Sequence, residues 1–121
     1  MSKRILVVED EEDNRRIVRD LLTSVGYEII EAVTGEEGVK AAETHLPDLI
    51  LMDIQLPGLD GYEATRRIKA TPALRHIPII VVTSYALSGD DTKARAAGAD
   101  GYVAKPFSPR ELLAKIRQFL P

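Results

Sequence analysis

The 121-residue chain contains no cysteine and no tryptophan, and its two histidines, His45 and His76, are isolated. The absence of cysteine excludes disulfides and thiolate metal sites, and it suits a reducing compartment. No apolar run approaches the roughly 18 residues that span a bilayer, and the amino-terminal segment has no signal-peptide pattern. We therefore expect a cytoplasmic domain with no membrane span.

Positive charge is not in excess either. The chain has 16 Lys and Arg residues against 19 Asp and Glu residues, a formal net charge of −3. Nucleic-acid-binding domains usually carry a basic stripe, which this sequence lacks, so no direct contact with nucleic acid is expected. A Walker A loop and a G-x-G-x-x-G motif are also missing, so the glycines do not form a nucleotide cradle.

The chain instead alternates short apolar segments with amphipathic ones. The expected strands cover residues 4–8, 27–32, 49–52, 77–83 and 101–104. Apolar residues between them recur at helical spacing: Ile17, Leu21, Leu22 and Val25; Val39, Ala42 and Leu46; Ala64 and Ile68; Ala94 and Ala97; and Leu112, Leu113, Ile116 and Leu120. This alternation predicts a single α/β unit, a (βα)5 parallel sheet covered by helices on both faces.

Several expected helices begin with a capping residue that is followed three positions later by an acid. These pairs are Thr34 and Glu37, Asp60 and Glu63, Ser88 and Asp91, and Ser108 and Glu111. The first side chain accepts a hydrogen bond from a free backbone amide, and the acid complements the helix dipole. Gly26 and Gly98 fall at the other ends of helices, where a left-handed residue is expected.

The order of the strands can also be predicted. Residues 4–8, 49–52 and 77–83 are almost continuous in Val, Ile and Leu, as central strands should be, whereas 27–32 and 101–104 are more polar, as edge strands are. Right-handed crossovers then favour a flavodoxin-like, doubly wound sheet with the order 2-1-3-4-5. Such sheets bind ligands at the carboxyl ends of the strands, where the winding reverses.

Polar residues stand at those carboxyl ends: Glu9, Asp10, Asp53, Thr83, Ser84, Lys105 and Pro106. Crowded carboxylates repel one another unless a cation lies among them, and an all-oxygen set suits Mg²⁺ better than zinc. Asp10 and Asp53 are the expected direct ligands. Glu9 is expected to act through water, and the backbone carbonyl of Gln55 could complete the set.

The same arrangement suggests a reaction. A carboxylate beside a bound cation can attack a phosphoryl group and become an acyl phosphate, with Asp53 as the nucleophile. The ammonium of Lys105 and the hydroxyl groups of Thr83 and Ser84 would hold phosphoryl oxygens. Taken alone, an acid in the position of Asp53 more often caps the Pro-Gly turn that follows it. Its neighbours at the same edge favour the functional interpretation.

Four segments resemble the receiver domain of two-component response regulators: "ILVVED", "LILMDIQLPGLDGYE", "IIVVTS" and "GYVAKPF". The resemblance covers essentially the whole chain. It implies that residues 1–121 form a single receiver domain with no output domain. The segments "EDNRR" and "TSYALSGD" are similar to short stand-alone regulators of the cell-cycle type. They also occur in hybrid histidine kinases, so a receiver domain excised from such a kinase is the alternative.

The resemblance assigns roles to individual residues. It makes Asp53 the phosphoacceptor, and it places the Mg²⁺ site at Glu9, Asp10 and the Gln55 carbonyl. It also implies that Lys105 binds the phosphoryl group and that Thr83 and Tyr102 change conformation on activation. The peptide bond before Pro106 is expected to be cis. Glu9 departs from the family pattern, because many relatives carry aspartate there. Its longer side chain is expected to shift the metal shell slightly.

The resemblance also implies partners. The donor would be a histidine kinase or a histidine phosphotransfer protein, and Mn²⁺ is expected to substitute for Mg²⁺. A downstream protein effector would bind the face formed by the fourth helix, fifth strand and fifth helix. The protein would be a monomer or a weak phosphorylation-dependent dimer. It would not be an enzyme, apart from slow self-phosphorylation and autodephosphorylation.

Two other functions fit the sequence less well. An aspartyl-phosphate phosphatase of the haloacid-dehalogenase kind usually needs a second acid two residues after its nucleophile, where this chain has Gln55. A flavin carrier of the same topology needs a glycine- and hydroxyl-rich loop after the first strand. Residues 9–13 are instead five consecutive acids, which would repel a phosphate.

Overall fold

The computed structural model describes residues 2–83 and 90–121. Strands and helices alternate along the chain, as predicted. Their bounds are β1 (Arg4–Val8), α1 (Glu12–Ser24), β2 (Glu28–Ala32), α2 (Gly35–His45), β3 (Leu49–Asp53), α3 (Gly61–Ala70), β4 (Ile79–Thr83), α4 (Asp90–Ala96), β5 (Gly101–Ala104) and α5 (Pro109–Phe119).

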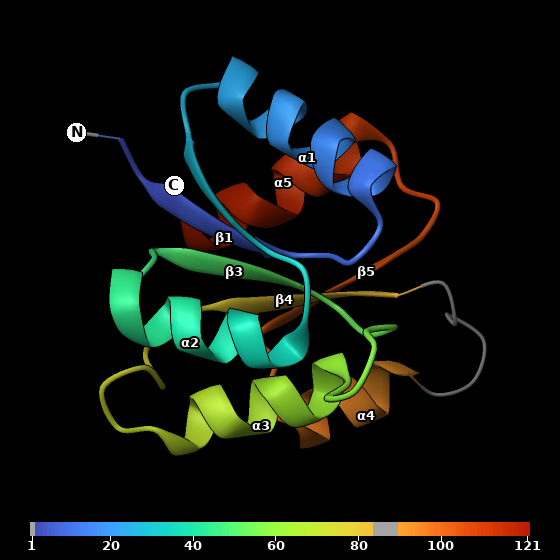
Figure 1. The fold of residues 1–121 in the computed structure, drawn as a ribbon. Helices are drawn as coiled ribbons and strands as arrows, with labels where there is room; N and C mark the ends of the chain where they lie inside the picture. The colour runs from blue at the N-terminus through green and yellow to red at the C-terminus, as the bar shows by residue number, and fades with distance from the viewer. Residues whose placement is uncertain (1, 84–89) are drawn as a thin grey trace.

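The five strands form one parallel sheet in the order β2-β1-β3-β4-β5. Helices α1 and α5 cover one face, and α2, α3 and α4 cover the other (Figure 1). The predicted flavodoxin-like, doubly wound architecture is therefore confirmed. The more polar strands β2 and β5 are the edges, as their composition indicated.

The sheet separates two apolar layers. Because side chains alternate along a strand, Ile5 and Val7 of β1 face α1 and α5, whereas Leu6 and Val8 face α2 and α3. The residues of β3 and β4 are buried throughout. Each large aliphatic side chain removed from water in these layers contributes about 1.5–3 kcal/mol to folding.

The expected helix starts are present wherever the structure describes them. The side chains of Thr34, Asp60 and Ser108 each accept a hydrogen bond from the backbone amide three residues on. Gly26 and Gly98 have φ angles of 98° and 99°, so both take the predicted left-handed conformation. The cap predicted at Ser88 lies outside the described residues.

Three predictions about elements were wrong. The strand expected at 77–83 begins at Ile79, because Pro78 has no amide to donate to the ladder. Leu46, expected on a buried helical face, is 54% exposed because it caps α2 in a left-handed conformation with a φ of 46°. Ile17 and Val25, expected on the apolar face of the first helix, are also exposed; Ile17 lines a cavity, and Val25 follows the end of α1.

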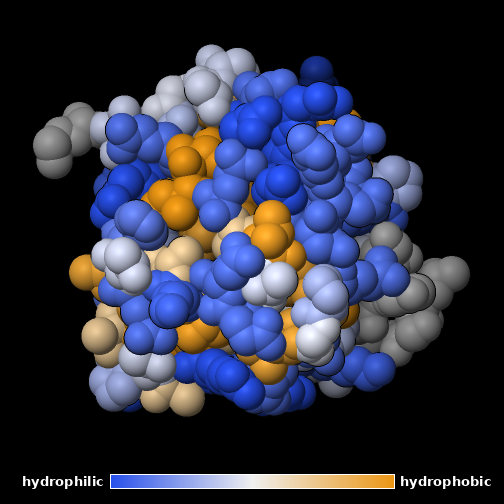
Figure 2. Space-filling model, in the orientation of Figure 1, coloured by the Kyte–Doolittle hydropathy of each residue, from blue (hydrophilic) through white to orange (hydrophobic). Residues whose placement is uncertain are grey.

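The surface is mainly hydrophilic on the face that Figure 2 shows, with hydrophobic residues in small separate groups. Scattered apolar residues of this kind are normal for a folded domain. Within residues 2–83 and 90–121, no helix has both the length and the apolar composition needed to cross a bilayer.

Candidate functional site

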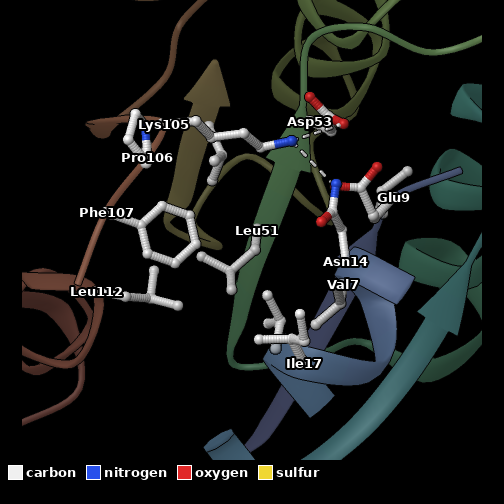
Figure 3. Close-up of a pocket in the computed structure, with 13 residues that line it drawn as sticks. Val7, Glu9, Asn14, Ile17, Leu51, Asp53, Lys105, Pro106, Phe107 and Leu112 are labelled. Carbon is white, nitrogen blue, oxygen red and sulfur yellow. Dashed lines mark hydrogen bonds and ion pairs between the residues drawn. The ribbon is translucent and has the colours of Figure 1, made fainter. Parts of the chain in front are cut away.

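Three charged side chains meet at the carboxyl edge of the sheet. Glu9 follows β1, Asp53 is the last residue of β3, and Lys105 follows β5. The Lys105 ammonium lies 3.1 Å from Glu9 Oε1 and 3.3 Å from Asp53 Oδ2, so it bridges the two carboxylates (Figure 3). The parallel sheet therefore joins groups that are up to 96 positions apart in the sequence.

A third acid completes a cluster at this edge. Glu9, Asp10 and Asp53 each offer a carboxylate oxygen, and these oxygens lie within 4.8 Å of one another. Glu9 and Asp53 are buried, at 6% and 5% exposure, whereas Asp10 is exposed. Mg²⁺ prefers oxygen ligands, uses few carboxylates and keeps some of its water. The buried pair and the open side toward Asp10 fit those requirements.

The cluster is electrostatically strained without a cation. Burial raises the pKa of Glu9 to about 7, and the neighbouring Asp53 adds to the rise, while Lys105 opposes it. Burial lowers the pKa of Lys105, but the carboxylates of Asp53 and Glu9 outweigh this and raise it above its ordinary value. One ammonium therefore does not fully compensate the acids, and the site favours an additional positive charge.

The backbone around Asp53 is shaped by a close approach that the sequence did not reveal. A Cβ at Gly61, the first residue of α3, would lie 2.1 Å from the carbonyl oxygen of Asp53, so only glycine fits there. The Gly61 amide donates to the carbonyl of Ile54 at 3.1 Å, and the Gln55 amide donates to Asp53 Oδ1 at 3.3 Å. The start of α3 thus supports the end of β3, which carries Asp53.

The remaining predicted site residues lie on β4 and β5 or just after them. Thr83, the last residue of β4, is fully buried, and its carbonyl accepts a 2.7 Å hydrogen bond from the Lys105 amide. Tyr102 is half-buried in β5 and packs against the layer beneath α3 and α4. The Lys105–Pro106 bond is cis, as the family resemblance implied. Ser84 lies outside the described residues.

A cavity of about 570 Å³ adjoins the acids, between α1 and α5. Its apolar walls include Ile17, Phe107 and Leu112, and its polar end is formed by Asp53 and Lys105 (Figure 3). Phe107 ends the segment "GYVAKPF" that carries the family resemblance, but its place in a cavity wall was not predicted. The charged residues at the edge of the sheet are therefore bordered on one side by an apolar cavity.

Residues 5–117 match the family model of the response regulator receiver domain. A curated relative, the polar-differentiation response regulator DivK of Brucella ovis, is 43% identical over 120 residues. The alignment covers 99% of this chain and 98% of DivK. The expected similarity to short stand-alone regulators of the cell-cycle type is therefore confirmed.

Solved structures support the same assignment. The receiver domain of a sensor histidine kinase from Pseudomonas aeruginosa, which has a magnesium ion coordinated in its active site cleft, is 40% identical with a TM-score of 0.93. That similarity covers 99% of this chain and 98% of the solved one. The Vibrio cholerae chemotaxis protein CheY4 is 27% identical over 98% of this chain and 99% of its own, with a TM-score of 0.92. This chain belongs to the response regulator receiver domains of two-component signalling.

Proposed function

We propose that the protein is a phosphorylation-controlled signalling module in which Asp53 accepts a phosphoryl group in a Mg²⁺-dependent reaction. The observation that carries the proposal is the cluster of Glu9, Asp10 and Asp53, with oxygens within 4.8 Å of one another and Lys105 beside two of them. The magnesium ion in the related kinase receiver supports the same use of the site.

In the proposed metal site, Asp10 and Asp53 bind directly, Glu9 binds through water, and the Gln55 carbonyl adds a neutral oxygen. A bound Mg²⁺ would neutralise the acids and the oxygens of the incoming phosphoryl group. Mn²⁺ shares the preference for oxygen ligands and is expected to substitute.

In the proposed reaction, a carboxylate oxygen of Asp53 forms a bond to phosphorus while the bond from phosphorus to the donor breaks. Lys105 moves from the carboxylates to one phosphoryl oxygen. The hydroxyl of Thr83, or the groups of Ser84, hold another oxygen. These residues mainly position the group and stabilise its charge, which is how proteins usually promote phosphoryl transfer.

The phosphoryl group adds roughly one unit of negative charge at Asp53. We propose that this charge draws Thr83 toward the site and that Tyr102 follows. The face formed by α4, β5 and α5 would then change and bind a downstream protein effector. The phosphodonor is a histidine kinase or a phosphotransfer protein, and the receiver acts as a monomer or a weak phosphorylation-dependent dimer. Residues 1–121 act as a signalling domain that does not turn over an external substrate.

Intact-mass spectrometry after incubation with acetyl phosphate tests the proposal. The wild type with Mg²⁺ should gain the mass of one phosphoryl group, and it should gain little with EDTA. Asp53→Asn should show no gain, because the amide is not a comparable nucleophile. Asp20→Asn, which changes an exposed aspartate on α1, is the matched control and should be labelled like the wild type. Labelling of Asp53→Asn at the wild-type rate would remove Asp53 from its role.

The similarity to a receiver domain of a sensor histidine kinase supports a second candidate, a receiver from a hybrid histidine kinase. Its immediate donor would then be the phosphohistidine of the attached kinase. The mass of the natural protein in cell extracts distinguishes the two, because a hybrid kinase is several times larger than a single receiver domain.

A further inference from the structure

Arg15, in the first turns of α1, makes two contacts that link the acidic loop to the sheet. Its Nη1 donates to the carbonyl oxygen of Glu9 at 2.9 Å, and its Nε lies 3.1 Å from Glu31 Oε1. Its side chain is only 16% exposed, compared with 56% for the adjacent Arg16, which pairs with Asp13 at the surface. The side chain of Arg15 is therefore fixed by its two contacts, whereas that of Arg16 is largely solvated.

Glu31 is itself well placed as an anchor. It lies on β2 and is paired in register with Val7 of β1. A second arginine, Arg19, reaches its other carboxylate oxygen at 3.3 Å. The Glu9 amide donates to the carbonyl of Ala32 on the same strand at 3.0 Å. The backbone at Glu9 is thus fixed to β2 through its amide directly and through its carbonyl by Arg15.

The carbonyl that Arg15 holds belongs to the peptide plane between Glu9 and Asp10. Because that plane is rigid, its rotation would redirect the backbone of both acids together. Asp10 is exposed, so its direction depends strongly on its backbone. We infer that Arg15, anchored by Glu31, is a positioning residue that holds Glu9 and Asp10 in the arrangement that binds the cation. This inference rests on the proposed Mg²⁺ site.

Charge and geometry predict opposite effects when Arg15 is removed. Deleting a cation that contacts the backbone between two of the proposed ligands would, by electrostatics alone, strengthen the binding of Mg²⁺. Losing the contact that fixes the loop would weaken it, since partners behind metal ligands usually affect metal affinity. Lysine keeps the charge but lacks the planar fork that reaches two acceptors at once. Whether the affinity for Mg²⁺ falls or rises when Arg15 is removed therefore separates a positioning role from a simple charge effect.

The test is a Mg²⁺ titration of the full chain, followed through the amide resonances of residues 9, 10, 53 and 55. Arg15→Ala should weaken binding on the order of three- to tenfold, the loss expected for one hydrogen bond behind a ligand. Arg15→Lys should fall between Arg15→Ala and the wild type. Arg16→Ala, the matched control on the same helix, should bind like the wild type. Thermal unfolding in EDTA verifies that each variant is folded.

Glu31 is tested by combining substitutions. Glu31→Ala should weaken Mg²⁺ binding, and the double variant Arg15→Ala/Glu31→Ala should be no weaker than Arg15→Ala alone, because Glu31 acts through Arg15. Additive losses would reject the anchoring role of Glu31. Binding by Arg15→Ala that equals or exceeds that of Arg16→Ala would overturn the inference. If the wild type itself shows no Mg²⁺-dependent shifts at these amides, the proposed metal site fails instead.

Discussion

At the scale of single residues, the acids at this edge cost stability because they are buried close to one another. Glu9 is buried beside Asp53, and Lys105 is the ammonium that contacts both. A buried carboxylate favours its neutral form, which is why the pKa of Glu9 rises to about 7. Ionising the Glu9 carboxyl group is therefore unfavourable in the folded chain.

Replacing Glu9 by glutamine should change how stability depends on pH. The pKa of Glu9 is about 7 in the folded chain, above its ordinary 4.5, so between these values the folded state holds a proton that the unfolded state has released. The wild type, in EDTA, should thus lose this stability as pH rises from about 4.5 to about 7. Glu9→Gln keeps the neutral form and should be more stable than the wild type at pH 8, on the order of 2 kcal/mol.

Urea unfolding at pH 5 and pH 8 measures this difference. The control is Glu12→Gln, which changes an exposed acid of the first turn of α1 and should follow the wild type at both pH values. If Glu9→Gln keeps the wild-type slope of stability against pH, burial does not hold a proton on Glu9.

At the scale of elements, helix ends show how far local patterns reach. Thr34, Asp60 and Ser108 cap their helices as the sequence indicates, because capping depends only on a residue and the amides of the next turn. Leu46 does not follow the expected helical face, since α2 ends at His45 and Leu46 turns the chain in a left-handed conformation. Apolar spacing alone does not show where a helix stops.

This helix end predicts a stabilising substitution. Leu46→Gly should raise the free energy of unfolding by about 0.5–1 kcal/mol, because glycine adopts a positive φ without the Cβ clash that leucine carries. Leu46 is largely exposed, so little buried apolar surface is lost. Urea unfolding measures the change. Gly26→Ala, at a φ of 98° with open space around the new Cβ, is the opposite control and should destabilise. A loss of stability in Leu46→Gly would contradict this account.

At the scale of the whole molecule, the strand order creates the site. Strands β1 and β3 are neighbours at the point where the winding reverses, so the residues after them share one edge although they lie far apart in the chain. Asp10 is exposed at that edge, so the acids can be reached from solvent. The strand order thus brings the acids together, and their mutual repulsion lowers the free energy of unfolding of the whole domain.

Mg²⁺ should therefore stabilise the entire domain against heat. At a free concentration of ten times the dissociation constant, binding to the folded state alone contributes about 1.4 kcal/mol, which corresponds to a rise of a few degrees in Tm. Differential scanning calorimetry with MgCl₂, and with NaCl at equal ionic strength, measures the rise. Asp10→Asn should lose most of the effect. An equal rise with NaCl would show that screening, not a specific site, relieves the repulsion.

The sequence by itself determined the alternation of strands and helices, most helix caps, the strand order and the grouping of Glu9, Asp53 and Lys105 at one edge. Each of these follows from short-range rules, such as apolar periodicity and capping, or from the handedness of crossovers. The strand bounds were predicted to within two residues.

Only the tertiary structure decided three other features: the glycine requirement at Gly61, the exposure of Ile17, and the contact of Arg15 with the carbonyl of Glu9. Each depends on backbone or side-chain atoms that packing brings within a few ångströms. The spacing of residues along the chain does not determine such distances, because they depend on how the helices pack against the sheet.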